Sequence, residues 1–333
     1  MTLVEHAPEV WGMVFKKTDD PKLTRWLSRV KRAFPSASRT RFNKYLKKFK
    51  PDIVLCTHYL PLETLGEVRG EGSGRKRTGR ARENARGAGP FVVTVVTDFE
   101  AHALWMDACV DLYCVAAEET KARLVARGAS AESIVPTGIP ISGRFSTPID
   151  QLTVRRTLGL RDDLPTILVL SGGFGMGPVA EILAELDKVT RPLQAVVVAG
   201  KNAELRRELA GQDRKHPTHI LGFARNMHEL MAVADLIISK PGGLTSSEAL
   251  AMGKPLLILN PIPGQEAANS DFLLEHGAAS KINRVEDLPF RVDQLLKPGK
   301  LKEIEEAARG LGRTDAARDI CAEAVRRFSS CQQ

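Results

Sequence analysis

A pair of glycines that follows a short apolar stretch is the part of this sequence best suited to binding an anion. Residues 236–238 are apolar and predict a buried strand, which leads through Pro-Gly-Gly at 241–243 into a helix expected to begin at Leu244. The first N–H groups of a helix have no acceptor within the helix and carry a partial positive charge, so they favour an anion and above all a phosphate. The sequence therefore predicts a phosphate site on the amides near Leu244 and Thr245.

Further polar groups follow this corner. Glu248 lies about one turn into the predicted helix, where a carboxylate can accept hydrogen bonds from a pair of sugar hydroxyls. The next predicted strand, 255–259, leads to Gly264, Gln265 and Glu266 in what reads as a turn. Because the carboxyl ends of parallel strands meet at one edge of a sheet, these groups predict a nucleotide-sugar site. Phosphate would bind the amides, ribose would bind Glu248, and the transferred sugar would lie near Gln265 and Glu266.

Two other turns could add to this site. A glycine-rich turn at 171–177 offers a phosphate a second approach, although such turns also serve tight packing, and its spacing fits the dinucleotide fingerprint poorly. Another strand ends in Leu-Gly-Phe at 221–223, where a ring could hold a flat base. The competing interpretation makes Pro-Gly-Gly an ordinary strand-to-helix turn and Glu248 a solvated acid favoured by the helix dipole.

The best acid and base candidates lie in the first half of the chain. The strand predicted at 91–96 ends in Thr-Asp-Phe-Glu-Ala-His at 97–102. Polar residues at the carboxyl end of a buried parallel strand are where α/β folds bind ligands, so Asp98 and His102 are candidates for acid or base catalysis. His102 could equally be a structural histidine whose nitrogens are satisfied within the fold.

Charge is concentrated in the first half of the chain. Residues 1–150 hold 24 Lys and Arg against 17 Asp and Glu, whereas the remainder is nearly balanced. Residues 22–50 hold eleven Lys or Arg and no acid, within two predicted amphipathic helices. These helices could lie on an anionic membrane, or their apolar faces could pack on the domain core. The residues expected to meet lipid are Lys22, Arg25, Trp26, Arg29, Lys31, Arg32, Lys47 and Lys48.

Other features of composition exclude several classes of protein. No apolar run approaches the ~20 residues that span a bilayer, and the first 20 residues do not read as a signal peptide. The five cysteines lack metal-ligand spacing and predict reduced thiols in the cytoplasm. The basic insertion at 69–90 has no aromatic residue before Pro90 to stack a base, which argues against nucleic acid.

Alternation of strands with amphipathic helices predicts an α/β fold with parallel sheets covered on both faces. We expect a Rossmann-like domain at 1–145 on the acceptor and membrane side, and a second one at 146–313 that binds the nucleotide sugar. A C-terminal helix at 314–333 would cross back to the first domain.

Seven motifs, spread over most of the chain, add a family resemblance to this picture. They are Ser-Gly-Gly-x-Gly from 171, Gly-Phe at 222–223, Asp-x-x-Ile-Ser-Lys-Pro-Gly-Gly-Leu-Thr-x-x-Glu-Ala-Leu from 235, Pro-x-Pro-Gly-Gln-Glu-x-x-Asn from 261, Thr-Asp-Phe-x-x-His-x-x-Trp at 97–105, Val-Ala-x-Glu-Glu-Thr at 115–120 and Thr-Gly-Ile-Pro at 137–140. Together they resemble the bacterial and plastid diacylglycerol glycosyltransferases of the monogalactosyldiacylglycerol synthase type.

The resemblance implies an inverting, metal-independent enzyme of the GT-B fold, with two Rossmann-like domains facing a cleft. It would move a hexose from UDP-galactose or UDP-glucose to diacylglycerol or a related lipid, without a cofactor, at the cytoplasmic face of the membrane. The donor-binding residues that it implies are Gly172, Gly173, Phe223, Gly242, Gly243, Leu244, Thr245, Glu248, Gln265, Glu266 and Asn269.

One departure from the family's pattern concerns the start of the chain. The family opens with a strand, a glycine-rich loop bearing a histidine, and a long helix, and that histidine is its usual candidate base. This chain opens within a later segment, so we expect the N-terminal domain to be incomplete and His6 not to be that histidine. Either the chain is a fragment or has a misplaced start, or it binds the donor with weak or no transfer activity. Two alternatives stay open: an enzyme like UDP-N-acetylglucosamine epimerase, which has the same two-domain architecture, or a non-catalytic protein that binds UDP-sugar or membrane, which the missing unit favours. The oligomeric state is also open.

Overall fold

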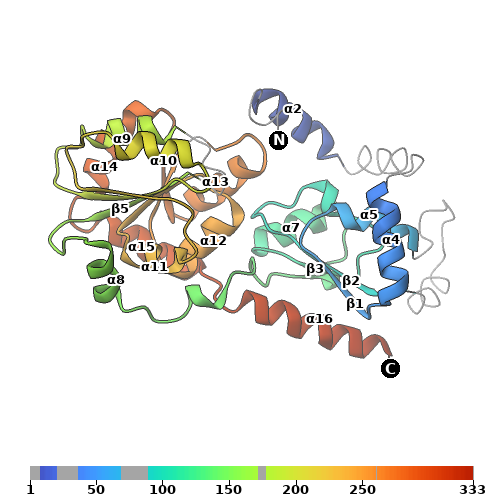
Figure 1. Ribbon diagram of the computed structural model, residues 1–333. Helices are drawn as coiled ribbons and strands as arrows, with labels where there is room; N and C mark the ends of the chain where they lie inside the picture. The colour runs from blue at the N-terminus through green and yellow to red at the C-terminus, as the bar shows by residue number, and fades with distance from the viewer. Residues whose placement is uncertain (1–7, 21–36, 69–88, 172–177, 260, 333) are drawn as a thin grey trace. The chain divides into compact units, whose positions relative to one another are not determined.

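The computed structural model describes residues 8–20, 37–68, 89–171, 178–259 and 261–332, which form two units (Figure 1). Unit 1 comprises Met1–Pro140 with Asp315–Gln333, and unit 2 comprises Ile141–Thr314. Gly172 and Gly173 lie outside the described residues, as do most of the 69–90 insertion and the cations from Lys22 to Arg32.

Unit 1 is built on a four-stranded parallel sheet in the order β1-β2-β3-β4. Its elements are α2 (Pro8–Thr18), α4 (Ala37–Phe49), β1 (Ile53–Cys56), α5 (Leu60–Val68), β2 (Phe91–Val95), η1 (Ala103–Trp105), β3 (Leu112–Cys114), α7 (Glu118–Ala126), η2 (Ala131–Ser133), β4 (Ile134–Val135) and α16 (Ala316–Gln332).

The central strand β2 explains how this sheet is covered on both faces. Successive side chains of a strand point to opposite faces, so Phe91, Val93 and Val95 share one face. They pack there against Ile320 and Ala324 of α16. Val92 points the other way and packs against Leu46 of α4 and against Leu62 and Leu65 of α5. A strand buried on both faces is mostly apolar, which is why β2 is apolar at every position except the buried Thr94 and its sequence does not alternate.

Unit 2 is built on a six-stranded parallel sheet in the order β10-β9-β8-β5-β6-β7. Its elements are η3 (Gly143–Phe145), α8 (Gln151–Leu158), β5 (Thr166–Leu170), α9 (Val179–Leu186), β6 (Gln194–Val198), α10 (Ala203–Ala210), β7 (Thr218–Leu221), α11 (Met227–Val233), β8 (Leu236–Ser239), α12 (Gly243–Ala251), β9 (Leu256–Leu259), α13 (Gln265–Glu275), β10 (Ala279–Ile282), η4 (Val285–Asp287), α14 (Leu288–Leu295) and α15 (Lys300–Leu311).

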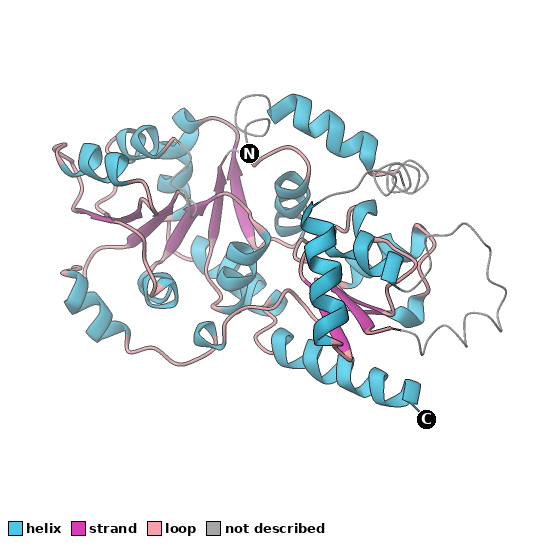
Figure 2. Ribbon diagram, turned by 45° about the vertical axis from the view of Figure 1, so that its right-hand side comes forward, coloured by secondary structure: helices cyan, strands magenta, loops and turns pink. Residues whose placement is uncertain are grey.

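Helices cover both faces of the unit 2 sheet. Helices α9, α10 and α14 lie on one face, and α8, α11, α12 and α15 lie on the other (Figures 1 and 2). One core cluster joins Ile167 and Val169 of β5 to Ile182 and Leu183 of α9 and to Val292 of α14. Because the strands are parallel and their register is fixed, the segments that follow β5, β6, β7, β8 and β9 emerge at one edge of the sheet.

The predicted fold class is confirmed, since both sheets are parallel and alternate with helices. The unit boundaries fall after Pro140 and after Thr314, a few residues from those expected at 145 and 313. Helix α2 was not predicted from the sequence, although Pro8 opens it and Val10, Met13 and Val14 repeat at helical spacing. Among the described residues, no helix combines the length and the apolar character that crossing a membrane requires.

Candidate functional site

The corner between β8 and α12 presents free backbone amides at the sheet edge of unit 2. Gly242 is the N-cap residue of α12 and contributes no side chain to cap it. The first hydrogen bond of the helix runs from Ser246 N to Gly242 O, so the three preceding amides have no acceptor within the helix. No described atom lies within 4 Å of the position where a Cβ on Gly242 would stand. The corner is therefore open to a group that approaches the backbone closely.

Glu248 lies in the second turn of α12, half-buried behind these amides. Burial raises the pKa of Glu248 to about 7. Among the described residues no Lys or Arg forms an ion pair with it. A half-buried carboxylate without a cationic partner is costly unless hydroxyl or amide donors satisfy its oxygens. Vicinal sugar hydroxyls are donors of that kind.

The Gly-Gln-Glu segment starts a helix, whereas the sequence suggested a turn. Gly264, with φ of 102°, is the N-cap of α13, and Gln265 and Glu266 form the first turn of that helix. Glu266 Oε2 accepts a hydrogen bond of 2.8 Å from Ile262 N, in a loop that precedes the helix. One carboxylate oxygen of Glu266 therefore holds the loop in place. Gln265 is half-buried at the same helix start.

Asn269 lies one turn further along α13 and is fully buried. Its Nδ2 donates a hydrogen bond of 3.0 Å to Pro241 O, in the corner that leads into α12. A fully buried side chain does not present its polar atoms to a ligand, so the contact favours a positioning role. Asn269 connects the start of α13 to the backbone that carries the free amides.

Phe223 is 57% exposed at the carboxyl end of β7, and Lys201 lies over its ring. Lys201 Nζ is 5.7 Å from the centre of the Phe223 ring, within the range of a cation–π contact. Sequence reasoning missed Lys201, because a lysine in a loop carries no local signal. The contact only becomes visible once β6 and β7 are paired side by side.

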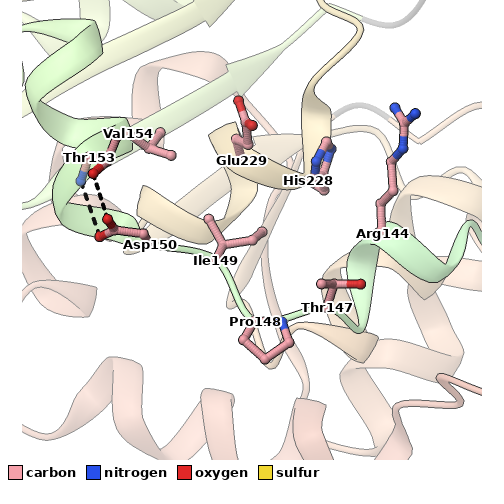
Figure 3. A pocket seen from close by; sticks show the side chains of 9 residues that line it. All are labelled: Arg144, Thr147, Pro148, Ile149, Asp150, Thr153, Val154, His228 and Glu229. Atoms are coloured by element: carbon pink, nitrogen blue, oxygen red, sulfur yellow. Dashed lines mark hydrogen bonds between the residues drawn. The ribbon is translucent and has the colours of Figure 1, made fainter.

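A separate pocket of about 380 Å³ lies between the start of α8 and the first turn of α11 (Figure 3). It is lined by Arg144, Thr147, Pro148, Ile149, Asp150, Thr153, Val154, His228 and Glu229. Its two carboxylates already have donors, since Asp150 accepts from Thr153 and Glu229 accepts from Asn226 Nδ2. None of the residues predicted to bind the donor lines this pocket.

His102, one of the two acid and base candidates, is 3% exposed in unit 1. Its Nε2 bonds to Phe15 O at 3.0 Å, and its Nδ1 accepts from Leu104 N at 3.1 Å at the start of η1. Burial lowers the pKa of His102. Both ring nitrogens thus bond to backbone groups, and these contacts favour the structural alternative. Asp98, the other candidate, is half-buried in the segment after β2.

Further contacts near His102 hold the end of α2 against the loop that follows β2. Asp19 Oδ1 accepts a hydrogen bond of 2.9 Å from Ala103 N. Asp19 also forms an ion pair with Arg127, which in turn donates to Ala101 O. The ring of Phe15 lies 4.3 Å from that of His102. The loop after β2 is therefore held from one side by α2.

Helix α4 divides its apolar residues between the core and the surface. Phe42 and Leu46 pack on the core, as one alternative expected. Tyr45 and Phe49 are 58% and 65% exposed, and their rings stack 5.5 Å apart. Lys47 and Lys48 are exposed beside them. Core packing therefore holds for Phe42 and Leu46. Tyr45 and Phe49 are open to solvent, which leaves them available for a membrane surface.

Comparison with known protein families gives these features a context. Residues 1–141 match the family model of monogalactosyldiacylglycerol (MGDG) synthase, and residues 166–320 match that of the glycosyltransferase family 28 C-terminal domain. A processive diacylglycerol β-glucosyltransferase of Bacillus cereus (strain ATCC 10987 / NRS 248) is 32% identical over 309 residues, which are 92% of this chain and 74% of that protein. This chain belongs to the same glycosyltransferase family.

A relative from Bacillus pumilus (strain SAFR-032), also a processive diacylglycerol β-glucosyltransferase, is 32% identical over 77% of this chain. The match spans 63% of that relative's length. The family members matched are thus longer than the segment that this chain shares with them.

Solved structures confirm the GT-B fold. MurG of Acinetobacter baumannii superposes with a TM-score of 0.62 at 20% identity, covering 86% of this chain and 77% of that one. A UDP-N-acetylglucosamine 2-epimerase gives 0.60 at 19% identity, covering 88% and 76%. HepE of Anabaena in complex with UDP gives 0.58 at 16% identity, covering 88% and 82%. At these identities the likeness concerns the fold alone.

Proposed function

We propose that this glycosyltransferase transfers a hexose from UDP-glucose or UDP-galactose to diacylglycerol or a related lipid, with inversion at the anomeric carbon. The observation that carries the proposal is the corner of unit 2, where helix amides without an acceptor in the helix precede a half-buried carboxylate that pairs with no Lys or Arg in the described part of the chain. Amides suit a diphosphate and the carboxylate suits ribose hydroxyls. The relatives named for diacylglycerol supply the acceptor class.

The donor would bind along the sheet edge of unit 2. Its diphosphate would lie on the amides of Gly243, Leu244 and Thr245, with Gly242 leaving room for close approach and the loop of Gly172 and Gly173 adding contacts. Ribose would bind Glu248, uracil would lie against Phe223 beneath Lys201, and the hexose would lie near Gln265 and Glu266. Asn269 would hold the corner in place through Pro241. The helix dipole and amides would stabilise the departing UDP, so the reaction would need neither a metal nor a cofactor.

Transfer would proceed by direct displacement. The acceptor hydroxyl oxygen forms a bond to the anomeric carbon as the bond from that carbon to UDP breaks, and the hydroxyl proton passes to a base. Asp98 is the better candidate for this base, because the residue is partly exposed in the segment after β2, whereas His102 is buried. His102 would instead hold the loop of Asp98 against α2.

The acceptor lipid would be met at the cytoplasmic face of the cell membrane, to which the protein would bind as a peripheral protein. Lys47 and Lys48 flank the exposed rings of Tyr45 and Phe49 on α4, a combination that suits an anionic lipid surface. The cations between Lys22 and Arg32, which lie outside the described residues, are proposed from the sequence to bind the same kind of lipid.

Transfer from radiolabelled UDP-glucose and UDP-galactose to diacylglycerol in anionic vesicles, followed by extraction into organic solvent, tests the proposal directly. Label in the organic phase is the expected result. UDP at 100 times its dissociation constant should also stabilise the fold by about 2.7 kcal/mol. An epimerised UDP-sugar without labelled lipid would favour epimerase chemistry, and binding of UDP without either product would favour a non-catalytic protein.

The assignment of the base is tested by two variants in the same assay. Asp98→Asn should lower the rate of transfer by 10² or more and leave UDP protection unchanged, because general base catalysis contributes about 10²–10⁴. His102→Asn should retain most of the transfer rate under conditions where it stays folded. A larger loss of transfer rate in His102→Asn than in Asp98→Asn would instead assign the role of base to His102.

A further inference from the structure

His58 is an exposed histidine that directly follows β1, and nothing in the proposed reaction yet uses it. Its ring stacks on that of Tyr59 at 4.4 Å. The Tyr59 ring in turn meets the buried Trp105 edge-on at 6.0 Å, and His58 itself lies 6.4 Å from Trp105. An imidazole held on two aromatic rings at the surface of unit 1 has a fixed position.

The hydrogen bond that His58 accepts also fixes its tautomer. Leu60 N donates to Nδ1 at 3.2 Å, so a neutral ring carries its proton on Nε2. Among the described residues no group bonds to that Nε2, and the side chain is exposed. The exposed ring can therefore donate this N–H to a ligand that offers an acceptor oxygen.

The strand register brings His58 to the sheet edge where Asp98 lies. In the parallel pair β1 and β2, Leu55 is opposite Val93 and Cys56 is opposite Thr94. Continuing this register sets His58 level with Val96, two residues before Asp98. The two side chains thus follow neighbouring strands at the same edge of the unit 1 sheet.

Apolar surface lies next to this donor. Leu60, whose amide bonds to the ring, has a side chain that is 55% exposed. A polar N–H beside an exposed leucine matches a molecule whose oxygen atoms adjoin a hydrocarbon chain. A glycerolipid has that chemistry at its ester and hydroxyl groups.

We propose that His58 binds the acceptor lipid, with Nε2–H donating to a glycerol hydroxyl or ester oxygen so that the reacting hydroxyl faces Asp98. The proposal rests on the proposed function and adds a positioning residue in the acceptor site. His58 binds and orients the lipid, and the proton that leaves the hydroxyl passes to Asp98.

The competing role for His58 is structural, because its Nδ1 also caps the start of α5 and its ring packs on Tyr59. Two variants separate these roles from lipid binding. His58→Asn keeps an acceptor for Leu60 N, but its amide N–H ends short of the Nε2 position. His58→Phe keeps a ring on Tyr59 and has no N–H in its side chain. His58→Gln restores an N–H at similar reach.

The experiment measures KM and kcat for diacylglycerol, the dissociation constant of UDP and the melting temperature for each variant. We expect His58→Asn and His58→Phe to raise KM for diacylglycerol at least tenfold, with kcat changed less than threefold and UDP binding changed less than twofold. His58→Gln should lie within threefold of the unchanged protein. His276→Ala, on α13 in unit 2, serves as the control and should leave KM for diacylglycerol unaltered.

The possible outcomes separate this inference from the proposed function. Unaltered KM in both His58→Asn and His58→Phe would overturn the inference while transfer by the unchanged protein still stood. Equal losses of UDP binding and of lipid KM would also overturn it, since they would indicate a general structural role. Failure of the unchanged protein to bind UDP would instead overturn the proposed function of unit 2.

Discussion

At the scale of single residues, Glu248 is under two opposing demands. It has to be ionised to accept hydrogen bonds from ribose, yet burial raises its pKa from 4.5 to about 7. The unfolded chain therefore binds fewer protons than the folded chain between pH 4.5 and 7. Stability falls as the pH rises through that window, and the cost is complete above pH 7. A ligand that donates hydrogen bonds to the carboxylate would offset this cost.

Glu248→Gln removes the buried charge, so it should raise stability and at the same time weaken the binding of ribose. We expect its free energy of unfolding to exceed that of the unchanged protein by about 2 kcal/mol at pH 8 and by far less at pH 5. Its affinity for UDP should fall at least tenfold. Melting curves at both pH values, with and without UDP, measure both effects. Glu204→Gln, an exposed first-turn glutamate of α10, is the control, and equal stabilisation of Glu248→Gln at pH 5 and 8 would refute the argument.

Asn269 carries a second prediction at this scale. Asn269→Leu removes the donor to Pro241 O and leaves a buried carbonyl unpaired, which costs about 1–3 kcal/mol. Because that carbonyl belongs to the corner with the free amides, UDP affinity should also fall, by about tenfold. Ser270→Ala is the matched control: Ser270 is equally buried, but its Oγ has no partner among the described residues. Chemical denaturation and UDP titration of both variants test this, and a loss of stability without a loss of UDP affinity would contradict it.

The sequence could predict residue types at this site better than their contacts. Glycine before a helix and a carboxylate one turn later are local signals, so Gly242 and Glu248 could be singled out from spacing alone. The partners of His102 could not be predicted, because Phe15 is 87 residues away and α2 was not recognised as a helix. Lys201 was missed for a similar reason, since its partner Phe223 lies on a neighbouring strand.

At the scale of elements, His102 couples the attachment of α2 to pH. Burial lowers the pKa of His102 below its ordinary 6.5, so the unfolded chain binds more protons than the folded chain below pH 6.5. The stability that this histidine contributes is complete above pH 6.5 and decreases as the pH falls toward the folded pKa. Asp19 opposes part of this shift, because its negative charge raises the pKa of the ring.

His102→Asn should weaken unit 1 at pH 8 by about 1–3 kcal/mol, because the hydrogen bond to Phe15 O is lost, whereas the Asn Oδ1 can still accept from Leu104 N. Between pH 7 and 5 its stability should decline less than that of the unchanged protein. Tryptophan fluorescence reports unit 1 selectively, because Trp11, Trp26 and Trp105 all belong to it. Identical pH slopes for the two proteins would contradict the prediction. His216 in unit 2, whose pKa burial also lowers, does not contribute to this signal.

Helix α4 allows a prediction about lipid contact. Tyr45→Ser with Phe49→Ser, and separately Lys47→Glu with Lys48→Glu, should each weaken binding to vesicles with anionic lipid by tenfold or more. Stability should change by no more than about 0.5 kcal/mol per substitution, since all four side chains are exposed. Vesicle co-sedimentation measures the binding, with Lys300→Glu and Lys302→Glu on α15 of unit 2 as the control. Equal binding by all variants would remove α4 from the lipid-contacting surface.

Strand and helix boundaries illustrate which elements a sequence specifies locally. The strands predicted at 91–96, 236–238 and 255–259 are found within one residue of those bounds as β2, β8 and β9, because short apolar runs lie there between glycine, proline and polar residues. The start of α13 was misjudged as a turn. Gly264 and the prolines before it favour a turn, but the hydrogen bond from Ala268 N to Gly264 O shows that a helix begins there.

At the scale of the whole molecule, the two units differ in how the chain forms them. Unit 2 is one continuous segment, 141–314, and its main core cluster lies entirely within it. Unit 1 is completed by a helix from the other end of the chain. Ile320, Ala324 and Phe328 of α16 pack on Phe91 and its neighbours in β2 and β3. Alternation of strands and helices could predict both sheets, and the C-terminal helix was expected to cross back to the first domain. The packing on β2 adds which face of the sheet α16 covers.

This difference predicts how the units behave when separated. A chain of residues 141–314 should fold alone and bind UDP within threefold of the full chain, because every described residue proposed to hold the donor lies in it. A chain of residues 1–140 should fold poorly, since without α16 one face of β2 is uncovered and each large apolar side chain exposed there costs about 1.5–3 kcal/mol. Adding residues 315–333 through a flexible linker should restore its fold. Circular dichroism and UDP titration measure these outcomes, and failure of the isolated 141–314 chain to bind UDP while folded would show that the donor site needs unit 1.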